Sequence, residues 1–196
     1  MHKPRGFTLI ELLVVIAIIA LLPDSLKAVR FRIPGWAKGA TVTVNGAATD
    51  GVAVGSYLRM VQPWKTGDVI ELELPMPVRL VEGHPKIEET RNQVAVLRGP
   101  LAYCLESVDL PDGIHVSDVL LPLQHDLTPQ HLRGLLEGVT VLEGNAFQFA
   151  PHDWGTQLYR EVLPQPLERL PMRLIPYYAR CNRGQCEMSV WLPVRR

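Results

Sequence analysis

The chain has 196 residues, with 20 basic and 20 acidic side chains and a sequence pI near 7.0. Zero net charge argues against a nucleic-acid partner, which usually requires a basic excess. The 47% of hydrophobic residues suffice for a buried core, 15 glycines and 17 prolines argue against a helical bundle, and three cysteines are too few for a disulfide-dense scaffold.

The N-terminus carries a short basic stretch, residues 1–6, followed by an apolar run, residues 7–22, that ends at Pro23. As a helix these sixteen residues would be about 24 Å long, against a bilayer core of about 30 Å. The run is short for a spanning helix but long enough for an export signal. We expect residues 1–22 to form a leader and a short apolar helix.

Glu11 is the exceptional residue of this run, because a carboxylate there costs about 3 kcal/mol on insertion. Residues 6–16, GFTLIELLVVI, closely resemble the type IV prepilin processing and methylation motif. The resemblance implies cleavage after Gly6, N-methylation of Phe7, and pairing of Glu11 with the amino terminus of a neighbouring subunit. It also implies a bacterial protein that is exported or anchored in the inner membrane through this helix.

Pro23 ends the predicted helix, because proline lacks the N–H that the next turn needs. In pilins this helix continues well beyond the membrane. We therefore interpret the leader as a targeting segment joined to an unrelated part, with a minor pilin-like structural protein as the alternative.

From residue 28 onward apolar and polar residues alternate, as in Val29–Ile33 and Ile70–Leu74, and turn signals such as Asn45-Gly46 separate the runs. This pattern predicts a mostly β chain of one or two antiparallel β-sandwich modules after the apolar helix. A composition shift at residues 107–113 suggests modules at 23–107 and 108–196. Thr128–Glu137 is predicted as a short helix, with Thr128 as N-cap and Pro129 at the first position.

Six strings in order resemble the C-terminal region of glycoside hydrolase family 127, the β-L-arabinofuranosidase-like enzymes, over residues 28–193. The strings are FRIPGW (31–36), TVTVNG (41–46), WKTGD (64–68), LPMPVR (74–79), LRGPLAY (97–103) and IPYYA (175–179), the last followed by NRG (182–184).

This resemblance implies two β-sandwich modules that follow an (α/α)6 barrel with the active site. It implies a retaining hydrolase whose cysteine nucleophile lies near a zinc ion held by cysteines and a glutamate, all in the barrel or at its edge. The six strings contain none of these residues, so we transfer no catalytic residue and expect no cofactor in this chain. The first module is expected to be incomplete, since family members have earlier strands where the leader stands here.

Cys181 and Cys186 bracket a short loop and are the candidate thiol site. If the segment is exported, they can form a disulfide. They can also contribute two of four zinc ligands, but a structural zinc site needs four and only Cys104 remains. We expect no metal site and a buried role for Cys104.

The function expected from these patterns is the non-catalytic β-sandwich part of such a hydrolase, truncated and inactive by itself, with a homodimer contact as one role. The alternative is a module that binds arabinose-containing glycans through exposed aromatic rings. The competing role for those rings is the core of the modules.

Overall fold

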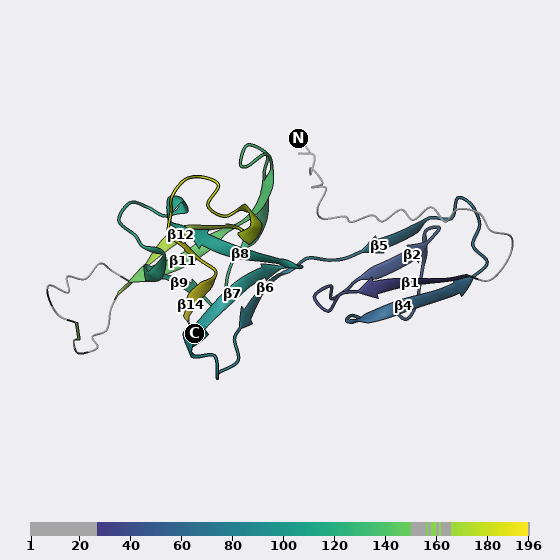
Figure 1. Ribbon diagram of the computed structural model, residues 1–196, viewed down its shortest axis with the longest axis horizontal. Coiled ribbons are helices and arrows are strands. Elements are labelled where there is room, and N and C mark those ends of the chain that lie inside the picture. The colour runs from purple at the N-terminus through teal and green to yellow at the C-terminus, as the bar shows by residue number, and fades with distance from the viewer. Residues whose placement is uncertain (1–26, 150–155, 157, 160, 162–165, 196) are drawn as a thin grey trace. The chain divides into compact units, whose positions relative to one another are not determined.

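The computed structural model describes residues 27–149, 156, 158, 159, 161 and 166–195 (Figure 1). The chain forms two compact units, of which the first ends at Pro77 and the second begins at Val78. The prediction of a mostly β chain is confirmed: the described elements are strands and four short 3₁₀-helices. The apolar helix predicted for residues 7–22 lies outside the described residues.

The first unit has two small antiparallel sheets. One sheet pairs β1 with β4, and the other has the order β3-β2-β5. The strands are β1 Lys27–Ile33, β2 Thr41–Val44, β3 Ala47–Ala48, β4 Ser56–Gln62 and β5 Ile70–Glu73.

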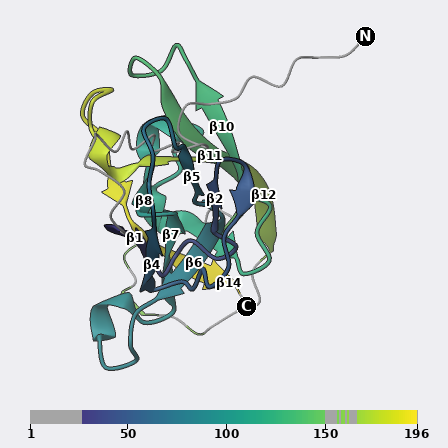
Figure 2. The ribbon, with the colours of Figure 1, turned by 90° about the vertical axis from the view of Figure 1, so that its right-hand side faces the viewer.

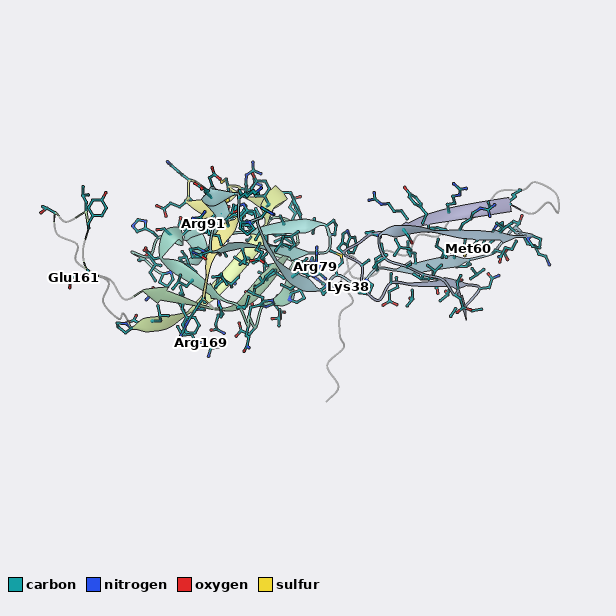
Figure 3. All side chains as sticks on the ribbon, turned by 90° about the horizontal axis from the view of Figure 1, so that it is seen from below. Lys38, Met60, Arg79, Arg91, Glu161 and Arg169 are labelled. Carbon is teal, nitrogen blue, oxygen red and sulfur yellow. The ribbon has the colours of Figure 1, made fainter. Side chains whose placement is uncertain are left out.

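A single apolar cluster receives side chains from both of these sheets. Its buried members are Ile33, Val42, Leu58, Met60, Trp64, Ile70 and Leu72, of which Met60 is labelled in Figure 3. The alternation predicted for β1 and β5 is confirmed, because Ile70 and Leu72 are buried while Glu71 and Glu73 are exposed. Each strand therefore turns one face to the core and the other to solvent.

The turn between β2 and β3 is the tight turn predicted from Asn45-Gly46. Asn45 has a φ of 50° and Gly46 a φ of 79°, the left-handed values that a two-residue hairpin of this type requires. The Asn45 side chain also donates to Asp68 Oδ1 at 3.0 Å, and its Oδ1 accepts from the Val69 N–H at 2.9 Å. The turn is thereby tied to the start of β5.

The second unit contains the larger sheet, with the strand order β13-β8-β12-β11-β9-β14-β7-β6. β10 pairs with β11, and both strands are labelled in Figure 2. β7 also pairs with β8, so the sheet curls back on itself. The strands are β6 Val78–Glu82, β7 Gln93–Arg98, β8 Leu101–Glu106, β9 Val119–Pro122, β10 Thr128–Leu132, β11 Val139–Phe149, β12 Leu167–Pro176, β13 Met188–Ser189 and β14 Trp191–Arg195. The 3₁₀-helices are η1 Glu88–Thr90, η2 Ser107–Asp109, η3 Val116–Asp118 and η4 Tyr177–Ala179.

Strand β8 supplies two apolar clusters of this unit from its two faces. Tyr103 and Leu105 belong to the larger cluster, whereas Cys104 packs in a smaller one with Val141 and Ile175. The Tyr103 hydroxyl donates to the Thr140 carbonyl at 3.0 Å, so its polar group is satisfied within the core.

The helix predicted for Thr128–Glu137 is wrong. Thr128–Leu132 is strand β10, which pairs antiparallel with β11 from Thr128↔Glu143 to Leu132↔Val139. Pro129, taken as a helix-start signal, also suits a strand that pairs on one side only, because such a position needs no N–H for the ladder. Pairing with the next strand along the chain overrides the local signal here.

The unit boundary lies at Pro77–Val78, whereas the composition shift suggested residues 107–113. Strands β6, β7 and β8 all precede that shift, and all belong to the sheet of the second unit. The composition shift corresponds instead to η2 and the loop that follows β8.

Gly144 in β11 provides a test of packing in the second unit. A Cβ atom there would lie 2.7 Å from Asp126 Oδ1 and 3.1 Å from the Leu127 Cα. Asp126 Oδ1 already accepts the Asn145 N–H at 2.8 Å, so the carboxylate cannot move away freely. We expect Gly144→Ala to lower the free energy of unfolding by about 1–3 kcal/mol.

The matched control is Gly134→Ala, where a Cβ atom would meet no atom within 4 Å. That variant should stay within about 0.5 kcal/mol of the wild type in urea unfolding. Equal unfolding midpoints for the two variants would contradict the packing argument.

Candidate functional site

The candidate site lies where strand β8 ends and the loop between η4 and β13 crosses it. β8 pairs with β12 through Cys104↔Ile175 and Leu105↔Leu174, and with β13 through Glu106↔Met188. These pairings bring the loop of residues 180–187 over Glu106, which is 75 positions before Cys181 in the sequence.

Glu106 is a fully buried carboxylate that anchors this loop. Its Oε1 accepts the backbone N–H of Cys181 at 2.5 Å. Its Oε2 accepts two N–H groups of Arg183, at 2.6 Å from Nη2 and 3.2 Å from Nε. Both oxygens therefore have charged or backbone donors, which offset the cost of removing the carboxylate from water.

Arg183 connects Glu106 to a second buried carboxylate, Asp109. Arg183 Nη1 donates to Asp109 Oδ1 at 2.8 Å, and Nη2 donates to Oδ2 at 2.5 Å. Arg173 Nη1 lies 3.6 Å from Asp109 Oδ1, and the same side chain bonds Glu143 at 2.7 Å. The hydrogen bonds to Asp109 raise the pKa of Arg183 despite its partial burial, so the guanidinium stays charged.

The hydrogen bonds to Glu106 shape the backbone of the loop at residues 180–187. Cys181 has a φ of +57°, and Gly184 has a φ of +117°, a conformation that only glycine adopts readily. The hydrogen bond from the Cys181 N–H to Glu106 holds the left-handed conformation of this non-glycine residue in place.

The two loop cysteines and Glu106 form a compact group. All three cysteines of the described residues are free thiols, with Cys104 buried and Cys181 exposed. One ligand atom each from Glu106, Cys181 and Cys186 lies within 4.8 Å of the others. The disulfide that Cys181 and Cys186 can form on export would thus join neighbouring thiols, and it stays a possibility that the structure does not test.

The environment keeps the thiols of Cys186 and Cys104 protonated near neutral pH. Desolvation, with the charge of Glu106 and hydrogen bonds to Cys181 and Glu106, raises the pKa of Cys186 to about 11. Burial, with the charge of Glu106, raises the pKa of Cys104 to about 12. The Cys104 thiol donates to the Ile175 carbonyl at 3.7 Å, as expected for a thiol in the core.

Sequence reasoning missed Glu106 because no local spacing links it to the cysteines. One signal was available in the strand Leu101–Glu106, since alternation puts Glu106 on the same face as Cys104. An acidic residue at the end of an otherwise apolar strand suggests a buried partner. The identity of that partner depends on the pairing of β8 with β13.

The other predicted site residues, Gly6, Phe7 and Glu11, lie outside the described residues. In the part of the chain that the structure describes, no helix has the length and apolar character needed to cross a bilayer.

Three family models match the chain. The glycoside hydrolase family 127 C-terminal domain matches residues 78–193, and the β-L-arabinofuranosidase, GH127 middle domain, matches residues 15–76. The first of these covers more than half of the chain. The chain belongs to glycoside hydrolase family 127. The third model, the prokaryotic N-terminal methylation motif, matches residues 1–22, so both resemblances seen in the sequence are confirmed.

Family 127 relatives extend well beyond this chain. A non-reducing end β-L-arabinofuranosidase from Bifidobacterium longum subsp. longum is 35% identical over 180 residues, which is 84% of this chain but 26% of the relative. A solved glycoside hydrolase matches with 41% identity and a TM-score of 0.82 over 89% of this chain and 29% of its own. A GH127 β-L-arabinofuranosidase from Geobacillus stearothermophilus T6 matches with 39% identity and a TM-score of 0.77, over 87% and 27% respectively. The chain thus spans between a quarter and a third of these relatives.

The division between the family 127 domains agrees with the structure. The middle-domain match ends at residue 76 and the C-terminal match begins at residue 78, on either side of Pro77, where the first compact unit ends. The cluster of Glu106, Cys181 and Cys186 therefore lies wholly in the family 127 C-terminal domain.

Arg183 is expected to dominate the stability of that domain. Arg183→Ala leaves Glu106 and Asp109 buried without their shared cation, so the free energy of unfolding should fall by about 3–5 kcal/mol. Chemical denaturation of the full chain measures this loss.

The matched control is Arg91→Ala, which removes a pair with Glu88 at 3.7 Å between side chains that are 62% and 81% exposed (Figure 3). Its effect should stay below about 1 kcal/mol, as for other solvated ion pairs. Similar losses in the two variants would mean that the buried network does not anchor the loop.

Proposed function

We propose that residues 27–195 serve as a non-catalytic C-terminal β part of a glycoside hydrolase of the β-L-arabinofuranosidase type. The observation that carries this proposal is the pair of family matches, one to a middle domain and one to a C-terminal domain. In agreement, the chain covers under a third of each enzyme compared. Its role is to support a catalytic module, without itself holding the reacting groups.

We infer a β-sandwich for the first unit, since its two sheets share one apolar cluster. Part of the aromatic set supports a structural role over glycan binding, although Tyr57 and Tyr178 are exposed. Trp64 and Tyr103 are buried in the cores, and the Arg180 guanidinium lies 4.0 Å from the centre of the Tyr177 ring. A ring covered in this way does not offer that face to a sugar.

The group of Glu106, Cys181 and Cys186 has the cysteine and carboxylate chemistry that the family 127 resemblance implies for a zinc ion. Its setting does not suit catalysis, because the pKa of Cys186 is raised to about 11 and Glu106 is held by Arg183. A cysteine nucleophile needs a lowered pKa or an adjacent base. We assign no catalytic residue to the chain.

We also propose that the leader targets the chain to the bacterial inner membrane or beyond it. The match of residues 1–22 to the methylation motif supports export or anchoring, with Glu11 inside the apolar run as the residue typical of that motif.

The purified chain is expected to release no aryl group from an aryl β-L-arabinofuranoside, with or without zinc and reductant. Among the residues that the structure describes we find no activated nucleophile beside an acid/base carboxyl, and the lack of a nucleophile removes many orders of magnitude of rate. A full-length relative assayed under the same conditions is the positive control. Release that disappears on Cys181→Ser or Cys186→Ser would overturn the non-catalytic assignment.

The leader is expected to be cut between Gly6 and Phe7 in a bacterial host that has a prepilin peptidase. Mass spectrometry of the purified protein should then show an N-methylated Phe7 terminus. Gly6→Val, which changes the residue at the cleavage point, is the control and should keep the intact N-terminus. Cleavage after Leu22, or an intact Met1 in the wild type, would count against a prepilin-type leader.

A further inference from the structure

A group of side chains in the described part of the second unit has no role in the proposed function. Glu106, Cys181 and Cys186 come from two segments far apart in the sequence, and they bring two thiols and a carboxylate together beside a surface hollow. Sulfur and carboxylate oxygen are both ligands of zinc and of related divalent ions.

We propose that Glu106, Cys181 and Cys186 bind a thiophilic divalent ion, such as Zn²⁺, with a water molecule as the fourth ligand. The site lies within the family 127 C-terminal domain and is independent of glycoside hydrolysis.

The distances between the three groups support this assignment. Zinc–sulfur bonds of about 2.3 Å place two sulfur ligands of a tetrahedral ion about 3.8 Å apart. The ligand atoms here lie within 4.8 Å of one another, so shifts of about an ångström or less complete the arrangement. Side-chain rotation of Cys181 and Cys186 in their loop is enough for such a shift.

The hydrogen bonds of Glu106 leave room for an ion. Arg183 donates two hydrogen bonds to Oε2, whereas Oε1 accepts the backbone N–H of Cys181. A carboxylate oxygen has two lone pairs, so Oε1 can keep the Cys181 N–H and also bind a cation. Arg183 then orients the carboxylate, as the outer hydrogen-bond partners of metal ligands usually do.

An ion at this position need not change the net charge of the site. Binding exchanges the two thiol protons for one divalent cation, which leaves the net charge of the site unchanged. The buried network of Glu106, Asp109 and Arg183 therefore gains no uncompensated charge when the ion binds.

The ion can reach the site from solvent. Cys181 is exposed, and Cys186 lines a hollow together with His115, Gln185 and Glu187. The ring Nδ1 of His115 lies 3.0 Å from Glu187 Oε1, so these two groups pair with each other at the rim. The open side provides space for the water ligand.

Oxidation to a disulfide is the competing fate of the two thiols. A disulfide uses only Cys181 and Cys186, whereas an ion uses all three groups that the fold assembles.

The full chain, reduced and stripped of metal, is therefore titrated with Co²⁺, whose thiolate complexes absorb in the near ultraviolet. We expect a thiolate-to-cobalt band that saturates at a single ion per chain and disappears when Zn²⁺ is added.

Variants identify the ligands. Cys181→Ser and Cys186→Ser should each abolish the band, and Glu106→Gln should weaken binding. Cys104→Ser is the matched control and should keep the band, since Cys104 lies in the core outside the three-residue group.

A measurement on the wild type avoids any dependence on variant folding. Zn²⁺ should slow the alkylation of Cys181 by iodoacetamide, as followed by peptide mass spectrometry. The proposal is overturned if reduced wild-type chain gives no cobalt band, if Zn²⁺ does not protect Cys181, or if the band survives in both loop-cysteine variants. A reversible mass loss of two hydrogens in untreated protein, with no cobalt band after reduction, would assign the thiols to a disulfide instead.

Discussion

The buried carboxylate of Glu106 is the constraint on which the C-terminal half of the second unit depends. Transfer of a carboxylate from water to a protein interior costs several kcal/mol, and close hydrogen-bond donors and opposite charges offset that cost. Arg183 and the Cys181 N–H provide those donors, and both belong to the loop of residues 180–187. The loop must follow the path that places these donors, so one buried charge specifies the course of a segment without regular structure.

The same constraint explains why the thiols meet beside the carboxylate. Cys181 is fixed because its own N–H donates to Glu106, and Cys186 immediately precedes Glu187, whose N–H donates to Ser107 Oγ at 3.0 Å. The loop is thus tied at both ends to the strand end that contains Glu106. The closeness of the two sulfurs follows from the backbone anchors, whatever the thiols bind.

Local sequence patterns predicted the strands well but not the contacts between distant segments. Alternation in β1 and β5, and the Asn45-Gly46 turn, depend on neighbouring residues, and the structure has them as predicted. The Thr128–Glu137 helix failed because Thr128–Leu132 pairs with β11, the next strand along the chain. Glu106 was missed because its role is defined by residues 75 and 77 positions later. Local spacing thus pointed to Cys181 and Cys186, but not to the carboxylate that the fold places beside them.

The cellular compartment decides between the two fates of the thiol pair. In an oxidising compartment free thiols that lie close together tend to pair, whereas thiolates bound to a metal ion are protected from oxidation. A prepilin-type leader would carry the chain towards such a compartment, because residues 1–22 match an export-associated motif. An ion bound before export would preserve the reduced cysteines, and an ion-free chain would lose the site to oxidation. If the leader exports the chain and the proposed site binds an ion, the order of metal loading and export would control the chemical state of Cys181 and Cys186. The hydrogen bonds of Arg183 to Glu106 and Asp109 involve neither thiol.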